Sequence, residues 1–428
     1  MAGPRTFYIE TLGCPKNQVD SDKLVGTLLA DGLTAADDPE SADVVVVNTC
    51  AFIDEARQES VETVLGLADR KRDDAELVVT GCMAERYGHE LAEALPEASV
   101  AGFGVPVTLS RKPERRNGAE LVPSFDLLNL PRPAPSAPWA YVKVAEGCDK
   151  ACGFCAIPSF RGPQRSRSRD QVLAEVEALA AGGVREVVLV AQDLASYGRD
   201  QGQGTRDLVP LVGEVRTVVD RVRLLYLYPS HLDDRLVEAI VATGVPYFDL
   251  SLQHVSAPLV RRMRRWGDGD RFLERIERIR ALAPDAALRS NFIVGYPGET
   301  EEDHDQLLAF VEEAQVDWCG FFAYSREEGT YAADLDGEVP PELVAERLAE
   351  LTELQDRITA TRRDALVGTE TDVLVDAPGV ARSHREAPEI DGLVLVPEDL
   401  PVGSITTVRI TAAEGPDLRA TPVLEPPR

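Results

Sequence analysis

The order of apolar and polar positions in the first hundred residues predicts strands and helices in alternation. Short apolar or alternating runs predict strands at 6–11, 43–47 and 76–80, and helical periodicity predicts helices at 21–29 and 52–68. Ser21 stands where a capping residue would open the first of these helices. This βαβαβ order predicts a parallel sheet with helices on its faces.

A second α/β segment follows the Pro-rich stretch 131–138, which marks a boundary. The pattern predicts six strands and several helices, with strands that begin near residues 140, 186, 223, 247, 288 and 317 and helices at 169–181, 233–242, 271–282 and 301–314. Because a closed barrel has eight βα units, six units predict an open partial TIM barrel. Its active site should lie at the carboxyl ends of the strands.

The third segment begins after a long amphipathic helix predicted at 341–366. Short β-rich runs at 371–375, 392–396 and 404–410, broken by Gly and Pro, predict a small antiparallel β-barrel. We therefore expect an α/β protein of three domains, at 4–118, 134–364 and 365–428.

Composition restricts where the protein works and what it binds. The chain of 428 residues carries a formal net charge of −28, so it should repel phosphate backbones unless it keeps a local basic patch, and it should attract a basic protein. An acidic proteome encoded by a GC-rich genome would also explain this charge. The first residues contain no apolar core of a signal peptide, and no apolar run reaches membrane-spanning length. The seven cysteines are an odd number in a chain without a signal, which argues against a disulfide framework. We expect a reduced, cytoplasmic protein with no membrane partner.

Three cysteines lie close together in a CxxxCxxC run formed by Cys148, Cys152 and Cys155. Three thiolates at this spacing can hold three corners of a cubane iron–sulfur cluster, which needs four ligands. No Cys or His nearby supplies the fourth, so one iron would remain open to a small molecule. A zinc knuckle is the alternative, but zinc sites usually have two CxxC-like pairs or a completing His. The run resembles the cluster loop of radical S-adenosylmethionine (SAM) enzymes, in which SAM occupies the open iron.

Three further cysteines follow the three predicted strands of the first segment. Cys14 comes after the first strand, Cys50 after the second and Cys82 after the third. Because parallel strands end at the same edge of a sheet, the three should converge there. The sequence predicts a second three-thiolate site, and the alternative is that each cysteine is a small buried apolar residue.

Two other places in the second segment are candidates for SAM binding. The turn after the fifth strand contains Gly295, Pro297, Gly298 and Glu299, and glycines there would let a ligand approach the backbone. Polar residues also end the second strand, and the pair Gln192 and Asp193 could hold the amino group of SAM. The remaining candidates receive no site role: Cys319 is interpreted as a core thiol, and His231 and His254 as hydrogen-bonded structural residues.

Four motifs together resemble the methylthiotransferases over nearly the whole chain. They are Thr-Leu-Gly-Cys-Pro-Lys-Asn at 11–17, Val-Asn-Thr-Cys-Ala-Phe-Ile at 47–53, the cluster loop and the turn at 293–300. Gly-Cys-Pro-Lys-Asn, Phe-Ile at 52–53 and Leu-Gln-His at 252–254 are similar to the branch that acts on small-subunit ribosomal protein twelve. The chain departs from a common pattern of that branch at Ser251 and Val255. The sister branch modifies an adenosine of tRNA and typically reads Gly-Cys-Gln-Met-Asn at its first cysteine.

The resemblance implies a domain for an auxiliary cluster, a radical SAM core and a TRAM barrel. It implies two 4Fe–4S clusters and SAM, with the loop cysteines on the SAM-cleaving cluster, the strand-end cysteines on the auxiliary cluster, and Phe154 backing the adenine. The expected reaction adds a methylthio group to the β-carbon of an aspartate in ribosomal protein twelve, whether that protein is free or in the ribosomal subunit.

The expected partners are an electron donor such as flavodoxin or ferredoxin, and a sulfur donor. Side-chain bases cannot open an unactivated C–H bond, which explains the need for radical chemistry. The acidic TRAM segment, with 11 acidic residues against 5 Arg, favours a protein substrate over tRNA. A non-enzymatic electron carrier is a third reading, but carriers coordinate every iron with protein ligands and need no barrel.

Overall fold

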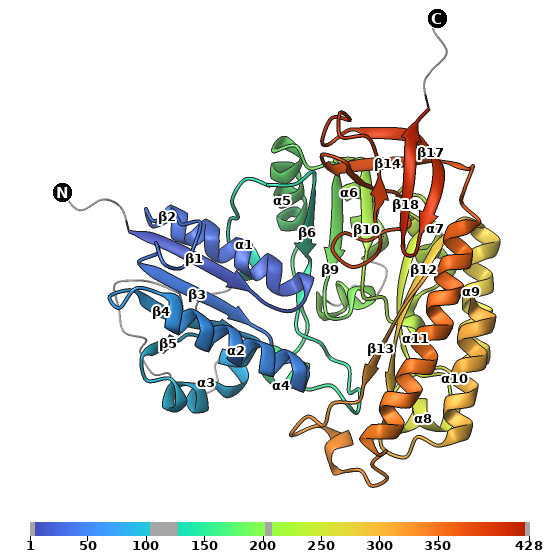
Figure 1. The fold of residues 1–428 in the computed structure, drawn as a ribbon, viewed down its shortest axis with the longest axis horizontal. Coiled ribbons are helices and arrows are strands. Elements are labelled where there is room, and N and C mark those ends of the chain that lie inside the picture. The colour runs from blue at the N-terminus through green and yellow to red at the C-terminus, as the bar shows by residue number, and fades with distance from the viewer. Residues whose placement is uncertain (1–4, 103–126, 202–207, 424–428) are drawn as a thin grey trace, which may run out of the picture.

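The computed structural model describes residues 5–102, 127–201 and 208–423. The N-terminal part is a five-stranded parallel sheet in the order β2-β1-β3-β4-β5 (Figure 1). Its elements are β1 Thr6–Thr11, α1 Pro15–Ala30, β2 Thr34–Ala35, β3 Val44–Thr49, α2 Asp54–Arg70, β4 Glu76–Gly81, α3 Cys82–Ala94 and β5 Ala98–Val100. The predicted parallel α/β sheet is confirmed. The domain limits expected at residues 4, 118 and 428 lie outside the described residues, and the other limits stay predictions.

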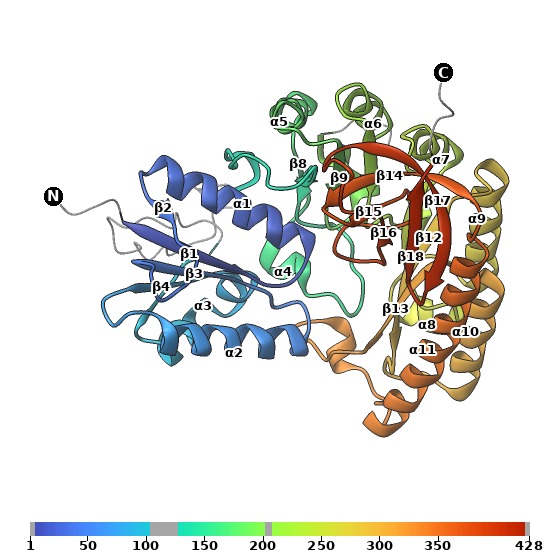
Figure 2. The same cartoon turned by 45° about the horizontal axis from the view of Figure 1, so that its top comes forward.

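Helices cover both faces of this sheet, as the continuous apolar run of β3 requires. Val44 and Val46 pack on one face with Leu24 of α1, whereas Val45 and Val47 pack on the other face with residues of α2 and α3. Figure 2 shows α1 on one side of the sheet and α2 and α3 on the opposite side. All six residues of β3 are therefore buried.

The first helix starts six residues earlier than the sequence pattern predicted. Pro15 occupies the first helical position, where its missing N–H costs nothing, and Cys14 is the capping residue. The prediction that Ser21 caps this helix is wrong, because Ser21 is an interior residue of α1. Its hydroxyl accepts hydrogen bonds from Thr11 Oγ1 (2.6 Å) and Asn48 Nδ2 (2.9 Å). The pattern also missed α3 and the short edge strands β2 and β5.

The central part confirms the predicted open barrel of six parallel strands. Two three-stranded sheets, β6-β9-β10 and β11-β12-β13, are joined by a bridge between Leu227 and Leu250. The strands are β6 Trp139–Lys143, β9 Glu186–Val190, β10 Arg221–Leu224, β11 Tyr247–Gln253, β12 Ala287–Val294 and β13 Trp318–Ala323. The outer helices are α5 Arg169–Ala181, α6 Leu208–Arg216, α7 Asp234–Val241, α9 Gly269–Leu282 and α10 Glu301–Ala314, of which α6 was not predicted. They lie along the outside of the two sheets (Figure 1) and bury side chains of the strands in the largest core.

The C-terminal part is the predicted small barrel, and it is closed. The helix α11 Pro341–Asp364 leads into it, and the strands follow the order β14-β15-β16-β18-β17. Their bounds are β14 Glu370–Ala377, β15 Val380–Arg382, β16 Val394–Leu395, β17 Ile405–Glu414 and β18 Asp417–Pro422. Four pairings are antiparallel, and the fifth, between β16 and β18, is parallel.

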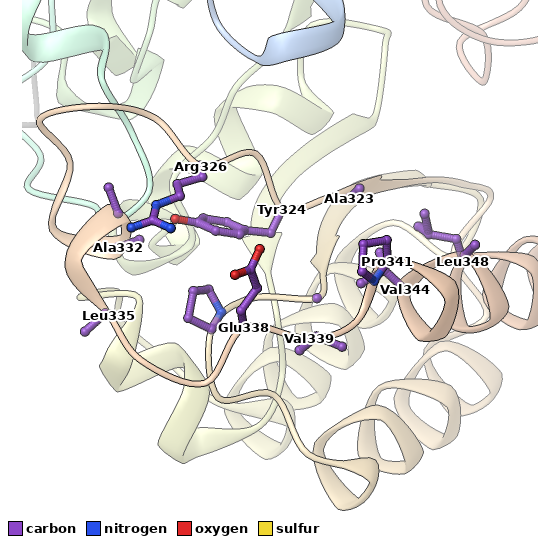
Figure 3. Close-up of a pocket in the computed structure, with 14 residues that line it drawn as sticks. Ala323, Tyr324, Arg326, Ala332, Leu335, Glu338, Val339, Pro341, Val344 and Leu348 are labelled. Atoms are coloured by element: carbon purple, nitrogen blue, oxygen red, sulfur yellow. The ribbon is translucent and has the colours of Figure 1, made fainter.

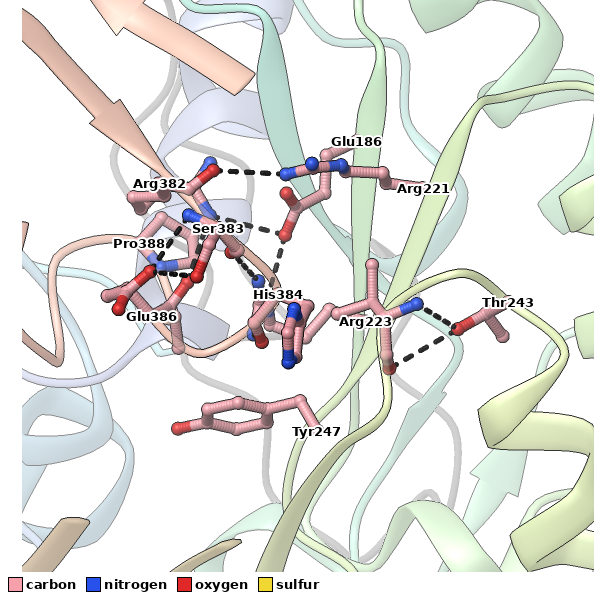
Figure 4. A network of polar contacts seen from close by, with 12 residues as sticks. Glu186, Arg221, Arg223, Thr243, Tyr247, Arg382, Ser383, His384, Glu386 and Pro388 are labelled. Carbon is pink, nitrogen blue, oxygen red and sulfur yellow. Dashed lines mark hydrogen bonds and ion pairs between the residues drawn. The ribbon is translucent and has the colours of Figure 1, made fainter. Parts of the chain in front are cut away.

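A loop of this C-terminal barrel, residues 382–391, plugs the amino-terminal end of the open barrel. Side chains of four core strands donate hydrogen bonds to it. Arg223 donates to the carbonyls of Ser383 (3.2 Å) and His384 (2.9 Å). Three aromatic side chains also donate: Tyr141 to the carbonyl of Pro388 (2.8 Å), Trp318 to the carbonyl of Arg385 (2.7 Å) and Tyr247 to the Asp391 carboxylate (2.6 Å). We call residues 382–391 the plug; part of it is drawn in Figure 4. The base of the barrel is thus closed by a segment far away in the sequence.

Glu186 lies at the centre of this closure and is fully buried. Its carboxylate accepts from Arg223 Nε (2.8 Å) and from Arg382 Nη1 (3.2 Å), so it joins the core to the C-terminal barrel (Figure 4). Burial alone would raise the pKa of Glu186, but the surrounding arginines outweigh it and lower the pKa to about 2. The carboxylate is therefore charged throughout the physiological range.

No helix in the described part of the chain combines the length and the apolar character needed to cross a membrane.

Replacing Glu186 by Gln should destabilise the fold strongly, because two buried arginines lose their shared counter-charge. We expect the free energy of unfolding to fall by about 3–5 kcal/mol in urea denaturation at pH 7. Glu186 has a lowered pKa, so its contribution is complete above about pH 4.5 and is lost as pH falls towards 2. The gap between wild type and Glu186→Gln should therefore shrink over that interval.

The neighbouring Arg185 is a matched control, because it forms an exposed ion pair with Asp220. Arg185→Gln should cost no more than about 1 kcal/mol. Equal losses in the two variants would contradict the central role of Glu186.

Candidate active site: two cysteine triplets

The first triplet lies at the carboxyl edge of the N-terminal sheet, with one cysteine at the end of each of three strands. Cys14 caps α1, Cys50 directly follows β3, and Cys82 is the first residue of α3. Gly13 has φ +89°, and a Cβ on it would lie only 2.9 Å from Cys50 Sγ, so the first loop packs directly against Cys50. We call Cys14, Cys50 and Cys82 the strand-end triplet.

The three thiols of this triplet influence each other electrostatically. Burial raises the pKa of Cys50 to about 12, and Cys82 and Cys14 add to the increase. Burial also raises the pKa of Cys82, against the opposing charge of Arg161. For Cys14 burial acts in the same direction, but Lys16, Arg161 and backbone N–H groups outweigh it and lower the pKa. Cationic metal would favour the thiolate form of all three.

The second triplet lies in the loop between β7 (Ala145–Glu146) and α4 (Ile157–Arg161). The loop is closed by a hydrogen bond from Cys148 N–H to the Gly162 carbonyl (3.1 Å), and Cys155 N–H donates to the Cys152 carbonyl (3.1 Å). Burial raises the pKa of Cys148 to about 11 and that of Cys155 to about 12, and in both cases Cys152 contributes to the increase. We call these three cysteines the loop triplet.

Each triplet offers three thiols as metal ligands. Among the residues that the structure describes, no group of three or more His, Cys, Asp or Glu side chains is arranged to hold a metal ion. A structural zinc site needs four tetrahedral ligands around one ion. Three thiolates with no nitrogen or oxygen ligand fit an iron–sulfur cluster, in which each cysteine binds a different iron.

The predicted pair at the end of β9 lies beside the loop triplet. Asp193 Oδ2 accepts from Ser196 Oγ (2.6 Å) and lies 3.5 Å from Lys150 Nζ within the loop. Gln192 donates through Nε2 to Glu146 (2.7 Å). Asp193 Oδ1 and Gln192 Oε1 are buried and have no hydrogen-bond partner in the described structure. Two such acceptors fit a ligand that brings N–H donors, as the ammonium group of SAM would.

The turn after β12 is held by its own glutamate. Glu299 Oε2 accepts from the N–H groups of Gly295 (2.6 Å) and Tyr296 (3.2 Å), and Oε1 accepts from Arg347 (3.0 Å). Gly298 N–H donates to the carbonyl of Gly337 (2.6 Å). Glu299 therefore braces the turn, and both of its oxygens are already bonded.

Gly295 and Pro297 line a cavity of about 300 Å³, shown in Figure 3. Its other walls come from the segment after β13 and from the start of α11, with Tyr324, Arg326 and Glu338 as polar groups. Gln192, Asp193 and Phe154 do not line it. The structure thus does not bring all predicted SAM contacts to one cavity.

Phe154 and the three unassigned residues occupy apolar or bonded positions. Phe154 packs in a small apolar cluster with Tyr296. Cys319 packs against the main core and burial raises its pKa, in agreement with a core thiol. His254 is buried and accepts from Ser256 N–H (3.1 Å), while His231 lies 2.8 Å from Arg199 Nη1.

Sequence reasoning missed the arginines that contact the cysteines. Arg161, the last residue of α4, donates through Nη2 to Cys82 Sγ (3.0 Å), and Arg265 donates through Nη1 to Cys152 Sγ (3.1 Å). The Arg161-Gly162 pair was visible after the loop, but no local signal connects it to a cysteine 79 positions earlier.

Gly81→Ala should disturb the strand-end triplet, because a Cβ there would lie 2.3 Å from Asn48 Oδ1 and 2.5 Å from the Thr49 carbonyl. Gly32 has a similar φ of +87° but open space around it, so Gly32→Ala isolates the backbone strain. We expect Gly32→Ala to cost about 1–2 kcal/mol and Gly81→Ala about 1–3 kcal/mol more. Iron bound after anaerobic reconstitution should fall in Gly81→Ala alone. Equal iron content in the two variants would refute a steric role for this position.

Comparison with known proteins agrees with the three-part architecture. Residues 6–102 match uncharacterized protein family UPF0004, 142–311 the radical SAM superfamily and 367–423 the TRAM domain. The fold resembles the radical SAM methyltransferase TsrM from Kitasatospora setae, with a TM-score of 0.52, 16% identity and coverage of 77% of this chain and 74% of that chain. At this identity the likeness concerns the fold alone.

Curated relatives are much more similar in sequence. The ribosomal protein uS12 methylthiotransferase RimO of Moorella thermoacetica is 44% identical over 415 residues, which cover 94% of this chain and 95% of the relative. The protein of the same name from Kineococcus radiotolerans is 41% identical over an alignment that covers 98% of each chain. The chain belongs to the RimO family of radical SAM methylthiotransferases, the branch that the cysteine motifs predicted.

Proposed function

We propose that this protein adds a methylthio group to the β-carbon of an aspartate in ribosomal protein uS12. The names of its relatives point to that substrate. The observation that carries the proposal is the pairing of two cysteine triplets, because a simple electron carrier needs neither an open coordination position nor a barrel. Arg161 connects the triplets physically, since it belongs to the loop-side helix and binds Cys82 of the other triplet.

In this proposal each triplet holds one 4Fe–4S cluster. Cys148, Cys152 and Cys155 hold the cluster that binds SAM, and Cys14, Cys50 and Cys82 hold the auxiliary cluster. The clusters and SAM supply the radical chemistry that opens an unactivated C–H bond, and the sulfur and methyl group that replace the hydrogen.

The protein contributes binding, orientation and exclusion of water. The buried acceptors of Gln192 and Asp193 would orient the SAM ammonium group beside the loop triplet. Phe154 would support the adenine. The turn with Gly295, Pro297, Gly298 and Glu299 would form another wall of the SAM site, and Glu299 would act through the backbone that it holds. The plug closes the base of the barrel.

The proposed partners follow from this chemistry. Reducing the clusters requires an electron donor such as flavodoxin or ferredoxin, and each turnover consumes sulfur that a donor must replace. The net charge of −28 would attract a basic protein substrate. We place the enzyme in the cytoplasm, where uS12 is available and thiols stay reduced.

A competition experiment tests the substrate. Reconstituted enzyme, SAM and reductant would be incubated anaerobically with bulk tRNA and with a peptide that carries the target aspartate loop of uS12. Mass spectrometry should find a methylthio mass gain on the peptide aspartate, because the acidic chain repels polyphosphates. Gain on tRNA alone would overturn the proposed substrate.

Removing one cysteine from each triplet should separate two activities. Cys14→Ala should abolish methylthiolation and leave reductive SAM cleavage largely intact, whereas Cys152→Ala should abolish both. Cys319→Ala is the matched control and should retain both, because Cys319 packs against the main core and belongs to neither triplet. Product analysis by liquid chromatography measures both activities, and equal loss of SAM cleavage in Cys14→Ala and Cys152→Ala would refute this division.

A further inference from the structure

Each cysteine triplet receives one hydrogen bond from a guanidinium group, which is buried for Arg161 and half-buried for Arg265. Arg161 Nη2 lies 3.0 Å from Cys82 Sγ of the strand-end triplet, and Arg265 Nη1 lies 3.1 Å from Cys152 Sγ of the loop triplet. The two arginines come from different elements, since Arg161 ends α4 and Arg265 follows α8 (Ala257–Arg262).

Arg161 is held in place by several acceptors. Its Nη1 donates to Asp20 (3.1 Å) and Glu146 (2.9 Å), and its Nη2 donates to Asn17 Oδ1 (2.7 Å) as well as to Cys82. The side chain is only 3% exposed. The guanidinium therefore has no freedom to turn away from the sulfur, and its charge is shared with two carboxylates.

Arg265 is placed differently. It donates through Nη2 to the Ser251 carbonyl and stacks on the ring of Tyr228, 4.4 Å from the centroid. In the described parts of the chain, no carboxylate lies within ion-pair distance of it, and its Nε is buried without a partner. Its positive charge is thus offset by no neighbouring acid and acts on the loop triplet directly.

Hydrogen bonds to the sulfurs of a cluster, and the charge around it, are known determinants of its reduction potential. A donor N–H and a positive charge both stabilise the reduced cluster, which carries one more negative charge. Each arginine contacts a cysteine of only one triplet, so each should act mainly on one cluster.

We propose that Arg161 and Arg265 are positioning residues that raise the reduction potentials of the auxiliary and SAM-binding clusters, respectively and independently. This inference rests on the proposed assignment of one cluster to each triplet. It gives the protein two separate controls over which cluster holds an added electron.

Redox titration of the reconstituted holoenzyme, followed by electron paramagnetic resonance, tests the inference. Arg161→Gln should lower the reduced-to-oxidised ratio of the auxiliary cluster at least tenfold at a fixed ambient potential, which is ~59 mV for a one-electron couple. The SAM-binding cluster should stay unchanged in this variant. Arg265→Gln should give the mirror-image result, and the Lys variants of both, which keep the charge, should shift less.

Arg278→Gln is the matched control, because Arg278 is exposed and pairs with Asp234 away from both triplets. Iron content identifies what fails. A wild type without a second cluster contradicts the cofactor assignment itself. The inference about the arginines is overturned if each variant shifts the reduction potentials of both clusters equally. It is also overturned if a variant with full iron content shifts neither potential. If Arg161→Gln loses iron, the iron content of Arg161→Lys decides between a tuning role and a structural role of Arg161. Loss of the auxiliary-cluster iron in both variants would overturn the tuning role and leave Arg161 a structural residue.

Discussion

The placement of the N-terminal sheet on the open barrel depends on four buried charges, in which Arg161 and Lys143 face Asp20 and Glu146. Each cation contacts both acids, with distances of 2.5 Å for Lys143–Glu146, 2.9 Å for Arg161–Glu146 and 3.1 Å for Arg161–Asp20. Taking these groups out of water is favourable only when every partner is in place. Asp20 belongs to α1 and the other three to the core, so the network fixes the N-terminal sheet against the barrel and fixes the strand-end triplet against the loop triplet.

Three further ion pairs hold the same two parts of the chain together. Lys23 of α1 pairs with Glu175 of α5 (2.7 Å), and both side chains are buried. Glu327, in the segment after β13, is buried between Arg57 (2.5 Å) and Arg86 (2.6 Å) of the N-terminal part. Figure 2 shows this segment reaching the end of α2. In each of these ion pairs one residue comes from the N-terminal part and the other from the open barrel. A displacement of one part against the other would therefore leave buried charges unpaired.

The fold could be predicted from the sequence where it depends on local periodicity and on the ends of parallel strands. That reasoning placed all six strands of the open barrel and put Cys14, Cys50 and Cys82 at one sheet edge, but it missed β15 and β18 of the C-terminal barrel. It failed where two local signals competed, as at the start of α1, where Ser21 is a good capping residue but Pro15 begins the helix. It could not find Asp20 and Asn17 as partners of Arg161, or the plug, because contacts over more than a hundred positions leave no pattern in any short window.

The plug changes how the C-terminal barrel should be regarded. By its position at the end of the chain and its small size, this domain resembles a detachable recognition module. Its loop 382–391 nevertheless supplies the floor of the barrel, where Arg223, Tyr247 and Trp318 find their acceptors. A chain truncated after α11 would therefore be a tube open at both ends, with its lower rim of arginine and aromatic side chains exposed to solvent. The C-terminal barrel is therefore a structural part of the catalytic core and not a separate domain attached to it.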